Sequence, residues 1–298
     1  MKITVPDYYT EFQCIADHCR HSCCIGWEID IDEATLTAYR NVKGAFGARL
    51  NTGIKAKGTH AHFILDENER CPFLNVRGLC DIYTELGKDS LCQICTDHPR
   101  FRNFYENITE VGLGICCEAA AKLILEQKDP MVFCHSGEGA PTEDEAIFFE
   151  EREKILTILQ NRKMPMGERL HAMLSFYDAA LPEKTLAEWA DVFLPLERME
   201  DEWTELLLLL KHHGKDCILS EENATAKEQL AVYFVFRHLW DFWEFGKERE
   251  GVVWISLSVC IISALAEISK KPLTDIARLY SAEIEYNEDT MKALLSLL

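Results

Sequence analysis

Cysteine is the residue type in this sequence whose number and spacing point most directly to chemistry. Eleven of the 13 cysteines fall at or before residue 134 of a 298-residue chain. They form groups along the sequence: Cys14, Cys19, Cys23 and Cys24; Cys71 and Cys80; Cys92 and Cys95; Cys116 and Cys117; and Cys134. Thiolates are ligands that suit Zn²⁺, Cu(I) and iron–sulfur clusters. The grouping therefore predicts a metal centre in the first half of the chain, whereas Cys217 and Cys260 lie in apolar helical sequence.

Disulfide bonds are the other common use of cysteine, and the sequence argues against them. Residues 1–8 contain no apolar segment and no small-residue cleavage site, so we expect a cytoplasmic protein. The cytosol keeps thiols reduced, and adjacent cysteines such as Cys23 and Cys24 rarely bridge each other. Metal ligation is therefore favoured over a disulfide framework.

The spacing leaves the kind of metal open. Cys14-x4-Cys19-x3-Cys23-Cys24 is not a common zinc-finger spacing, and adjacent ligands crowd a closed tetrahedral site. A [4Fe–4S] cluster takes four thiolates, often from separate segments. Cys92-x2-Cys95 also suits a thiol-based redox switch, which is a third hypothesis.

Charge and composition exclude some classes of partner. The chain carries 31 Lys and Arg against 50 Asp and Glu, a net charge of −19, and 48% of its residues are hydrophobic. There is no basic stripe, so we expect no nucleic-acid partner. The acid excess indicates a soluble surface or a field that attracts a lysine-rich partner. These numbers predict a folded globular protein.

The pattern of the first 140 residues indicates short elements interrupted by Gly, Asn and Asp. We expect short strands at 62–65 and 104–106, the second continuing as a hairpin to residue 112. Ser90 is a predicted cap for a helix carrying Cys92 and Cys95, and a further helix is expected from Cys116 to Leu125. Residues 136–142 have linker composition, so a cysteine-rich metal domain is predicted over 1–140 and a helical domain over 141–298.

The second half is helical throughout in its pattern. The predicted helices cover residues 143–162, 166–180, 184–192, 197–213, 223–246, 252–269, 273–283 and 288–298. Thr142 with Glu145 predicts a capping box, and Ser220 with Asn223 a weaker one. The uncharged run 252–266 is too short for the roughly 20 residues of a membrane span, so we expect a buried helix and no span. The fold class expected is predominantly α, with short strands in the cysteine-rich region.

Ordered motifs carry a family resemblance over about residues 5–125. They are Phe12-Gln13-Cys14-Ile15, Cys19, Cys23-Cys24-Ile25-Gly26-Trp27, Cys71-Pro72-Phe73-Leu74, Leu79-Cys80, Leu86-Gly87, Cys95 with Pro99-Arg100, and Cys116 with Glu118-Ala119-Ala120. This layout resembles the flagellin lysine-N-methylase family and is similar to a broader cysteine-cluster family described as zinc- or iron-chelating. Cys117 stands where the family usually has proline.

The resemblance implies an S-adenosylmethionine-dependent protein-lysine N-methyltransferase that acts on flagellin monomers and is organised around a [4Fe–4S] cluster, with zinc as the alternative. The metal ligands it implies are Cys14, Cys19, Cys23, Cys24, Cys71, Cys80, Cys95 and Cys116. Arg100 is our prediction for a carboxylate contact, on the cofactor or elsewhere, because its planar fork fits a carboxylate; the alternative is that it ties a loop. His98 is either a metal ligand or a hydrogen-bond donor to the cluster.

The sequence does not identify a site for the methyl donor or a catalytic base. Gly112-x-Gly114 is a two-glycine fragment that a close turn explains equally well. Tyr8, Tyr9 and Tyr83 could each polarise an amine, and nothing selects among them. An amine nucleophile needs no radical, so we expect the metal centre to organise structure. The alternative function is a non-catalytic zinc- or iron-chelating binding module.

Overall fold

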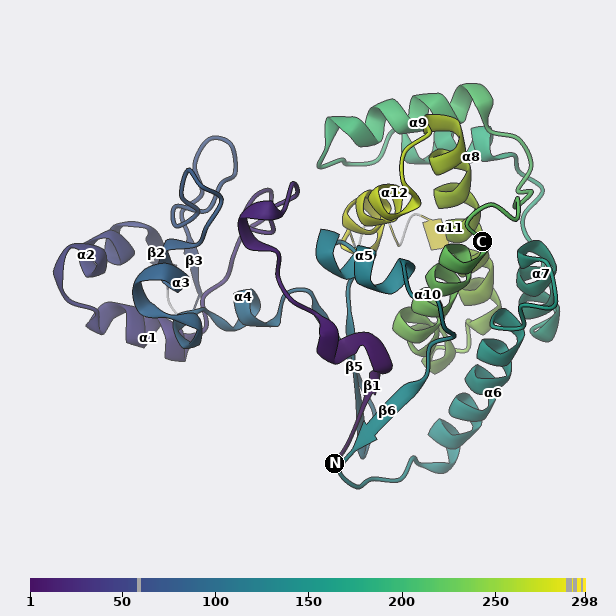
Figure 1. Ribbon diagram of the computed structural model, residues 1–298, viewed down its shortest axis with the longest axis horizontal. Helices are drawn as coiled ribbons and strands as arrows, with labels where there is room; N and C mark the ends of the chain where they lie inside the picture. The colour runs from purple at the N-terminus through teal and green to yellow at the C-terminus, as the bar shows by residue number, and fades with distance from the viewer. Residues whose placement is uncertain (58–59, 288–290, 292–293, 296) are drawn as a thin grey trace. The chain divides into compact units, whose positions relative to one another are not determined.

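The computed structural model divides the chain into two compact units (Figure 1). It describes residues 1–57, 60–287, 291, 294–295 and 297–298. One unit comprises Met1–Phe12 and Phe101–Leu298 and is called the helical unit here; the other, Gln13–Arg100, is called the cysteine-rich unit. The division differs from the predicted boundary near residue 140. The reason is that the first strand of the chain pairs with strands formed by residues 100–136, and this sheet packs with the helices.

That sheet has four strands in the order β4-β5-β1-β6. The strands are β1 (Lys2–Pro6), β4 (Arg100–Phe104), β5 (Ile108–Leu113) and β6 (Phe133–Ser136). β1 runs parallel to β5, with Lys2 opposite Ile108, and antiparallel to β6, with Val5 opposite Cys134. β4 and β5 form a hairpin closed by Tyr105, whose N–H donates to the Ile108 carbonyl at 2.9 Å. A hairpin was predicted here, but the strand predicted at 104–106 is wrong, because β4 ends at Phe104 and residues 105–107 form the turn.

The remainder of the helical unit is a bundle. Its helices are α5 (Glu118–Leu125), α6 (Glu143–Leu159), α7 (Met166–Phe176), α8 (Leu186–Phe193), α9 (Asp201–His213), α10 (Ala224–Glu244), α11 (Glu248–Ser269), α12 (Leu273–Tyr280) and the π-helical turn η4 (Ser281–Glu285). Predicted helix ends from 143 to 280 lie within four residues of these bounds. The predicted helix at 288–298 falls largely outside the described residues. The predominantly α class and the helical second half are confirmed.

Caps explain where two of these helices begin. Thr142 and Glu145 form the predicted capping box at α6, because each side chain bonds the other's backbone N–H. The box predicted at Ser220 is wrong. The Ser220 hydroxyl donates to Glu267 at 2.6 Å, and α10 follows Asn223, whose side chain makes no cap.

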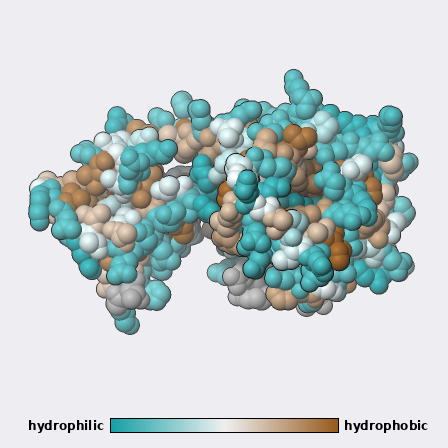
Figure 2. Space-filling model, turned by 90° about the horizontal axis from the view of Figure 1, so that it is seen from below, coloured by the Kyte–Doolittle hydropathy of each residue, from teal (hydrophilic) through white to brown (hydrophobic). Residues whose placement is uncertain are grey.

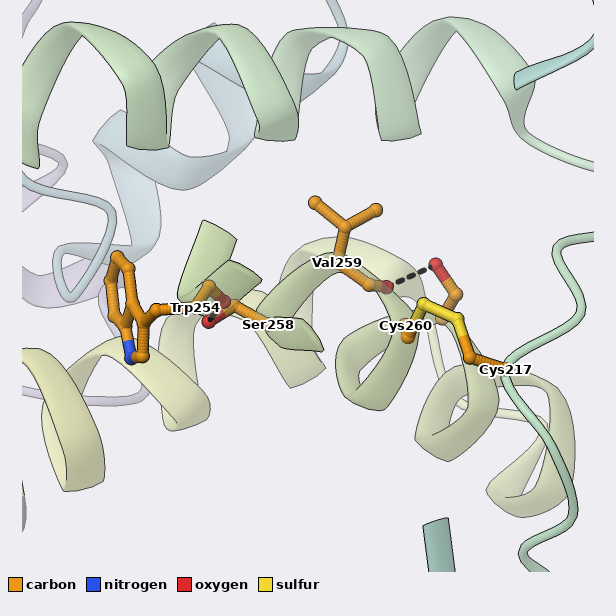
Figure 3. Close-up of a disulfide and its surroundings, with 6 residues drawn as sticks. Cys217, Trp254, Ser258, Val259 and Cys260 are labelled. Atoms are coloured by element: carbon orange, nitrogen blue, oxygen red, sulfur yellow. Dashed lines mark hydrogen bonds between the residues drawn. A yellow bond between two sulfur atoms is a disulfide. The ribbon is translucent and has the colours of Figure 1, made fainter. Parts of the chain in front are cut away.

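α11 lies in the core of the bundle. By length and composition it is the one described helix apolar enough to cross a membrane, but 83% of that stretch is buried inside the protein. This agrees with the buried helix predicted for 252–266. The hydroxyl of Ser258 bonds the Trp254 carbonyl one turn earlier, which satisfies a polar group within an apolar helix (Figure 3).

A disulfide joins Cys260 of α11 to Cys217, which follows α9 (Figure 3). The expectation that disulfides are unlikely is wrong for this pair. Their Cα atoms are 5.6 Å apart, inside the range a disulfide bridges. No local pattern predicts this approach, because the two residues are 43 positions apart.

The cysteine-rich unit is built from short elements. They are η2 (Ala16–His18), α1 (Glu33–Asn41), α2 (Gly44–Thr52), β2 (Ile54–Lys57), β3 (His60–Phe63), α3 (Asp81–Leu86), η3 (Lys88–Ser90) and α4 (Gln93–Asp97). β2 and β3 form an antiparallel hairpin, so the strand predicted at 62–65 exists but begins two residues earlier. The Ser90 cap is wrong: Ser90 ends η3, and Cys92 is the residue before α4.

Hydrophilic side chains cover most of the face shown in Figure 2, and the hydrophobic ones form small separate groups. This is the surface that the acidic composition leads one to expect.

Candidate metal centre

Five cysteines of the cysteine-rich unit share one apolar core. Cys71 and Cys92 are buried in it, and Cys24, Cys80 and Cys95 pack against it. The core side chains around them include Phe63, Phe73 and Tyr39. We call these five residues the thiol core. They come from four separate segments, so the fold brings together groups that are far apart in the sequence.

Backbone hydrogen bonds join the first two segments. The N–H of Cys71 donates to the Cys24 carbonyl at 2.8 Å, and the N–H of Gly26 donates to the Glu69 carbonyl at 3.1 Å. Gly26 has φ +91°, which a residue with a side chain adopts only with strain. Trp27 Nε1 donates to the Cys23 carbonyl at 2.8 Å and so holds the Cys23–Cys24 loop. The conformation of the Cys-Cys-Ile-Gly-Trp motif therefore places Cys24 beside Cys71.

A tight turn brings Cys80 to the same place. The N–H of Leu74 donates to the Cys71 carbonyl at 3.0 Å, and Leu74 forms an antiparallel bridge with Cys80. Arg49 holds the turn from outside, donating to the Pro72 carbonyl and to Asp81, each at 2.6 Å. Cys71 and Cys80 therefore lie at the two ends of one small loop.

The last two thiols lie at the start of α4. Cys92 and Cys95 have their sulfur atoms 3.3 Å apart. Cys95 is also close enough to Cys24 and Cys71 for their charges to raise its pKa, after the larger effects of the Cys92 hydrogen bond and of burial. Cys92 was absent from the predicted ligands. The signal that could have found it is its spacing to Cys95, which we assigned only to a redox switch.

The five thiols of the core differ in pKa because their surroundings differ. A hydrogen bond from Cys23 lowers the pKa of Cys24 to about 7, and Ser22 and Arg70 act in the same direction against burial. Burial raises the pKa of Cys71 to about 12 and also raises that of Cys80. A hydrogen bond with Cys95 also lowers the pKa of Cys92, although Cys92 is buried. Cys24 and Cys92 thus ionise most readily, whereas Cys71 and Cys80 keep their protons until a cation replaces them.

The spacing of the thiols bears on the kind of metal they fit. In a closed zinc site, Zn–S bonds of about 2.3 Å place the sulfur atoms about 3.8 Å apart. Within the part of the chain that the structure describes, no three thiols have all their sulfur atoms within 4.8 Å of one another. The described sulfur atoms are therefore not spaced as the ligands of one compact tetrahedral ion are.

Three predicted ligands of the cysteine-rich unit lie outside the thiol core. Cys14 and Cys23 are exposed and Cys19 is half-buried. The Cys19 thiol donates to the His21 carbonyl at 3.3 Å, and Cys14 accepts from the Ala16 N–H at 3.4 Å. The segment between Cys14 and Cys19 lies against the turn before Cys80, because a Cβ added to Gly78 would lie 3.5 Å from the Cα of Asp17. These cysteines therefore flank the thiol core and are not part of it.

Cys116 belongs to the helical unit. It precedes α5, and its thiol hydrogen-bonds Tyr286. Arg237 lies over the Tyr286 ring at 4.7 Å and pairs with Glu285, so Cys116 has a polar environment of its own. Its role as a metal ligand stays a prediction.

The other predicted residues have structural contacts. Arg100 Nη1 donates to the Thr96 carbonyl at 3.2 Å, which holds the end of α4. Burial lowers the pKa of His98 to about 4, so its ring is neutral at physiological pH. A cofactor contact by Arg100 remains a prediction.

Comparison with known proteins was made on sequence and on structure. The chain is 26% identical over 192 residues to a lysine-N-methylase of Salmonella choleraesuis and to one of Salmonella typhimurium, covering 58% of this chain and 46% of theirs. It is 28% identical over 135 residues to the flagellar biosynthetic protein FliU of Salmonella muenchen, covering 43% of this chain and 80% of that protein. The chain thus spans just under half the length of those two lysine-N-methylases. No family profile and no solved structure matches.

Proposed function

Because the chain is a distant relative of the lysine-N-methylases, we propose that it is a protein-lysine N-methyltransferase acting on flagellin. The relationship agrees with the resemblance of the cysteine motifs. Flagellin as the substrate is supported by the name of the flagellar relative. The activity is a proposal for this chain, which aligns with less than half of the two methylases.

The observation that carries the metal part of the proposal is the convergence of the thiol core. Cys24, Cys71, Cys80, Cys92 and Cys95 would hold a [4Fe–4S] cluster, which needs four of them. Zinc is the alternative. The low pKa of Cys24 provides a first thiolate for an incoming cation, and the apolar core around the others excludes water.

Bound metal would supply rigidity to this unit. The segments that carry the thiol core are otherwise held by short turns and by a few backbone bonds, such as that from Cys71 to Cys24. A centre that crosslinks four segments would fix their positions. In this proposal the metal organises structure and takes no part in methyl transfer.

S-adenosylmethionine would supply a methyl group on a sulfonium, which a neutral lysine amine displaces in line. Such a transfer requires a desolvated amine and an acceptor for its proton. Arg100, at the end of the cysteine-rich unit, is the residue we propose for a carboxylate of the donor. The proton acceptor is unassigned.

The test is direct. Anaerobically prepared protein with its metal in place is incubated with flagellin monomers and S-adenosylmethionine, and the flagellin is weighed by mass spectrometry. We expect increments of one methyl group on lysine residues. No increment with metal-replete protein would contradict the proposal, and an Arg100→Lys variant would test the donor contact through the KM for S-adenosylmethionine.

A second candidate function is a metal-chelating binding module without catalysis. It is favoured by the thiol core, whose five cysteines offer metal ligands whether or not a methyl donor binds. Calorimetric titration with S-adenosylmethionine separates the two functions: saturable binding supports the methyltransferase, and its absence supports the module.

A further inference from the structure

The outer face of a small strand pair carries three side chains whose arrangement points to a second metal site. Glu28, Asp30 and His62 each offer one ligand atom, and these atoms all lie within 4.8 Å of one another. All three belong to the cysteine-rich unit, but none is a cysteine and none contributes to the thiol core. We propose that they bind a divalent cation of the Mn²⁺ type through one imidazole and two carboxylates.

The backbone fixes the three ligands on one face. Asp30 and His62 form an antiparallel bridge, and the N–H of Phe63 donates to the Ile29 carbonyl at 3.1 Å. Side chains alternate along a strand, so Ile29 and Ile31 point into the core while Glu28 and Asp30 point out.

The same alternation operates on β3. Ala61 and Phe63 are buried, which turns His62 to the outer face. The inner face of this strand pair packs in the apolar core that also contains Cys71 and Cys92. The proposed site therefore lies on a frame that the core already holds in place.

The distance between ligand atoms fits shared coordination better than a hydrogen bond. His62 Nε2 and a Glu28 carboxylate oxygen are 3.6 Å apart, beyond the usual limit of a hydrogen bond. Two neighbouring ligands about 2.2 Å from one octahedral ion are about 3.1 Å apart. A small movement of the exposed Glu28 side chain towards His62 would therefore bring the pair to the spacing of two ligands of one ion.

Charge supports the same conclusion. Within the described residues, neither Glu28 nor Asp30 forms an ion pair with lysine or arginine, and Glu28 faces the His62 ring. Two carboxylates this close repel each other unless a cation lies between them. Lys55 is directly opposite His62 on β2 and is exposed, so its charge opposes a cation without filling the site.

The choice of ion follows from the ligands and their exposure. Carboxylates and water suit Mn²⁺, and one imidazole is compatible with it, whereas the thiol core prefers softer metals. The Glu28 side chain is 65% exposed and that of His62 is 24% exposed, which leaves room for water in the remaining coordination positions. The two sites should therefore take different ions.

Manganese titration of the full chain, with the thiol core loaded and oxygen excluded, tests the proposal. Free Mn²⁺ is followed by electron paramagnetic resonance, which loses intensity on binding. One Mn²⁺ per chain is expected, with the affinity reduced at least tenfold in His62→Gln and in Asp30→Asn. Lys55→Gln should raise the affinity a few-fold because it removes a like charge.

His60→Gln is the matched control, since His60 lies on the same strand and face but outside the ligand group. Glu28→Gln changes a well-exposed residue, so it reports on binding even where His62→Gln unfolds the chain. Unchanged affinity in Glu28→Gln and Asp30→Asn would overturn the proposal. So would an absence of Mn²⁺ binding at millimolar concentration.

Discussion

In the helical unit, buried charged groups are paired with opposite charges or accept from backbone N–H groups, whereas in the cysteine-rich unit buried thiols are grouped with one another. Arg152 and Glu110 form a two-bond pair at 2.5 and 2.7 Å, and Glu228 accepts from Arg162 and Arg169. Such groups satisfy each other without a ligand. Clustered thiols repel one another when they ionise, so the proposed metal belongs to the cysteine-rich unit.

The two units also differ in the size of their apolar cores. Among the described residues, the core of the helical unit includes 52 buried apolar side chains, against 12 for the 88 residues of the cysteine-rich unit. Small units with little core commonly depend on metals or disulfides. If the proposed metal is bound, the stability of the cysteine-rich unit should depend on it, and that of the helical unit should not.

The largest expected effect is loss of the cysteine-rich fold when the metal is removed. Structural zinc sites contribute about 10–16 kcal/mol to folding, so chelation should unfold this unit. Hydrogen exchange read by mass spectrometry should show lost protection in residues 13–100 and unchanged protection in α10 and α11. Cys71→Ser should act likewise, and Cys134→Ser on β6 is the control. Full protection in metal-free protein would contradict the comparison.

The next largest effect is expected from breaking a buried ion pair of the helical unit. Glu110→Gln leaves the Arg152 charge buried without its counterion, which should lower the free energy of unfolding by about 3–5 kcal/mol. Urea unfolding followed by tryptophan fluorescence measures it. The control is Glu150→Gln, which removes an exposed pair with Lys154 and should change nothing measurable. Equal effects of the two variants would show that burial is not the cause.

Removing the disulfide should cost the helical unit about 2–4 kcal/mol, because Cys217→Ser frees a 43-residue loop in the unfolded chain. Cys217 also lines a pocket of about 450 Å³, which gives a reductant access. Dithiothreitol should lower the Tm of the parent to that of the variant. A Tm of the parent that does not respond to reductant, with both thiols shown to be free, would contradict this assignment.

Acid should weaken the helical unit through Glu285. Burial alone would raise the pKa of this carboxyl, but Arg237 and hydrogen bonds from His238 and Ser281 lower it to about 2 from 4.5. The stabilisation, of the order of 3 kcal/mol, is present above pH 4.5 and is lost as the pH falls from 4.5 towards 2. Glu285→Gln should flatten this part of the pH profile of the unfolding free energy. A variant profile parallel to the parent's would exclude Glu285 as the source.

The smallest effect is expected at a helix cap. Thr142→Ala removes the acceptor for the Glu145 N–H at the start of α6 and should cost about 1 kcal/mol. Thr142→Ser keeps the hydroxyl and should restore the stability in urea unfolding. Neither variant should alter the metal content, since the cap lies in the helical unit.

The sequence predicted the helical unit well because its helices are long and amphipathic. Thr142 marked the start of α6, and the uncharged run 252–266 marked the buried helix α11. The helices α1 and α2 were missed. α1 buries only Leu36 and Tyr39, so its periodic signal covers less than two turns.

The sequence pattern did not predict the contacts between segments that are far apart in the chain. The pairing of β1 with β5 joins Lys2 to Ile108, and no local pattern specifies it. The same is true of Cys217 and Cys260. For the thiol core, the motifs indicated Cys24, Cys71, Cys80 and Cys95. The inclusion of Cys92 and the separate surroundings of Cys14, Cys19 and Cys116 depend on the conformation of the turns between the segments, which no local pattern specifies.

Iron and sulfide analysis of the anaerobically purified protein tests the central claim most directly. We predict a brown protein with one [4Fe–4S] cluster per chain, retained in Cys134→Ser and lost in Cys71→Ser. A colourless chain without bound metal, or a cluster that survives serine at each position of the thiol core in turn, would contradict the account.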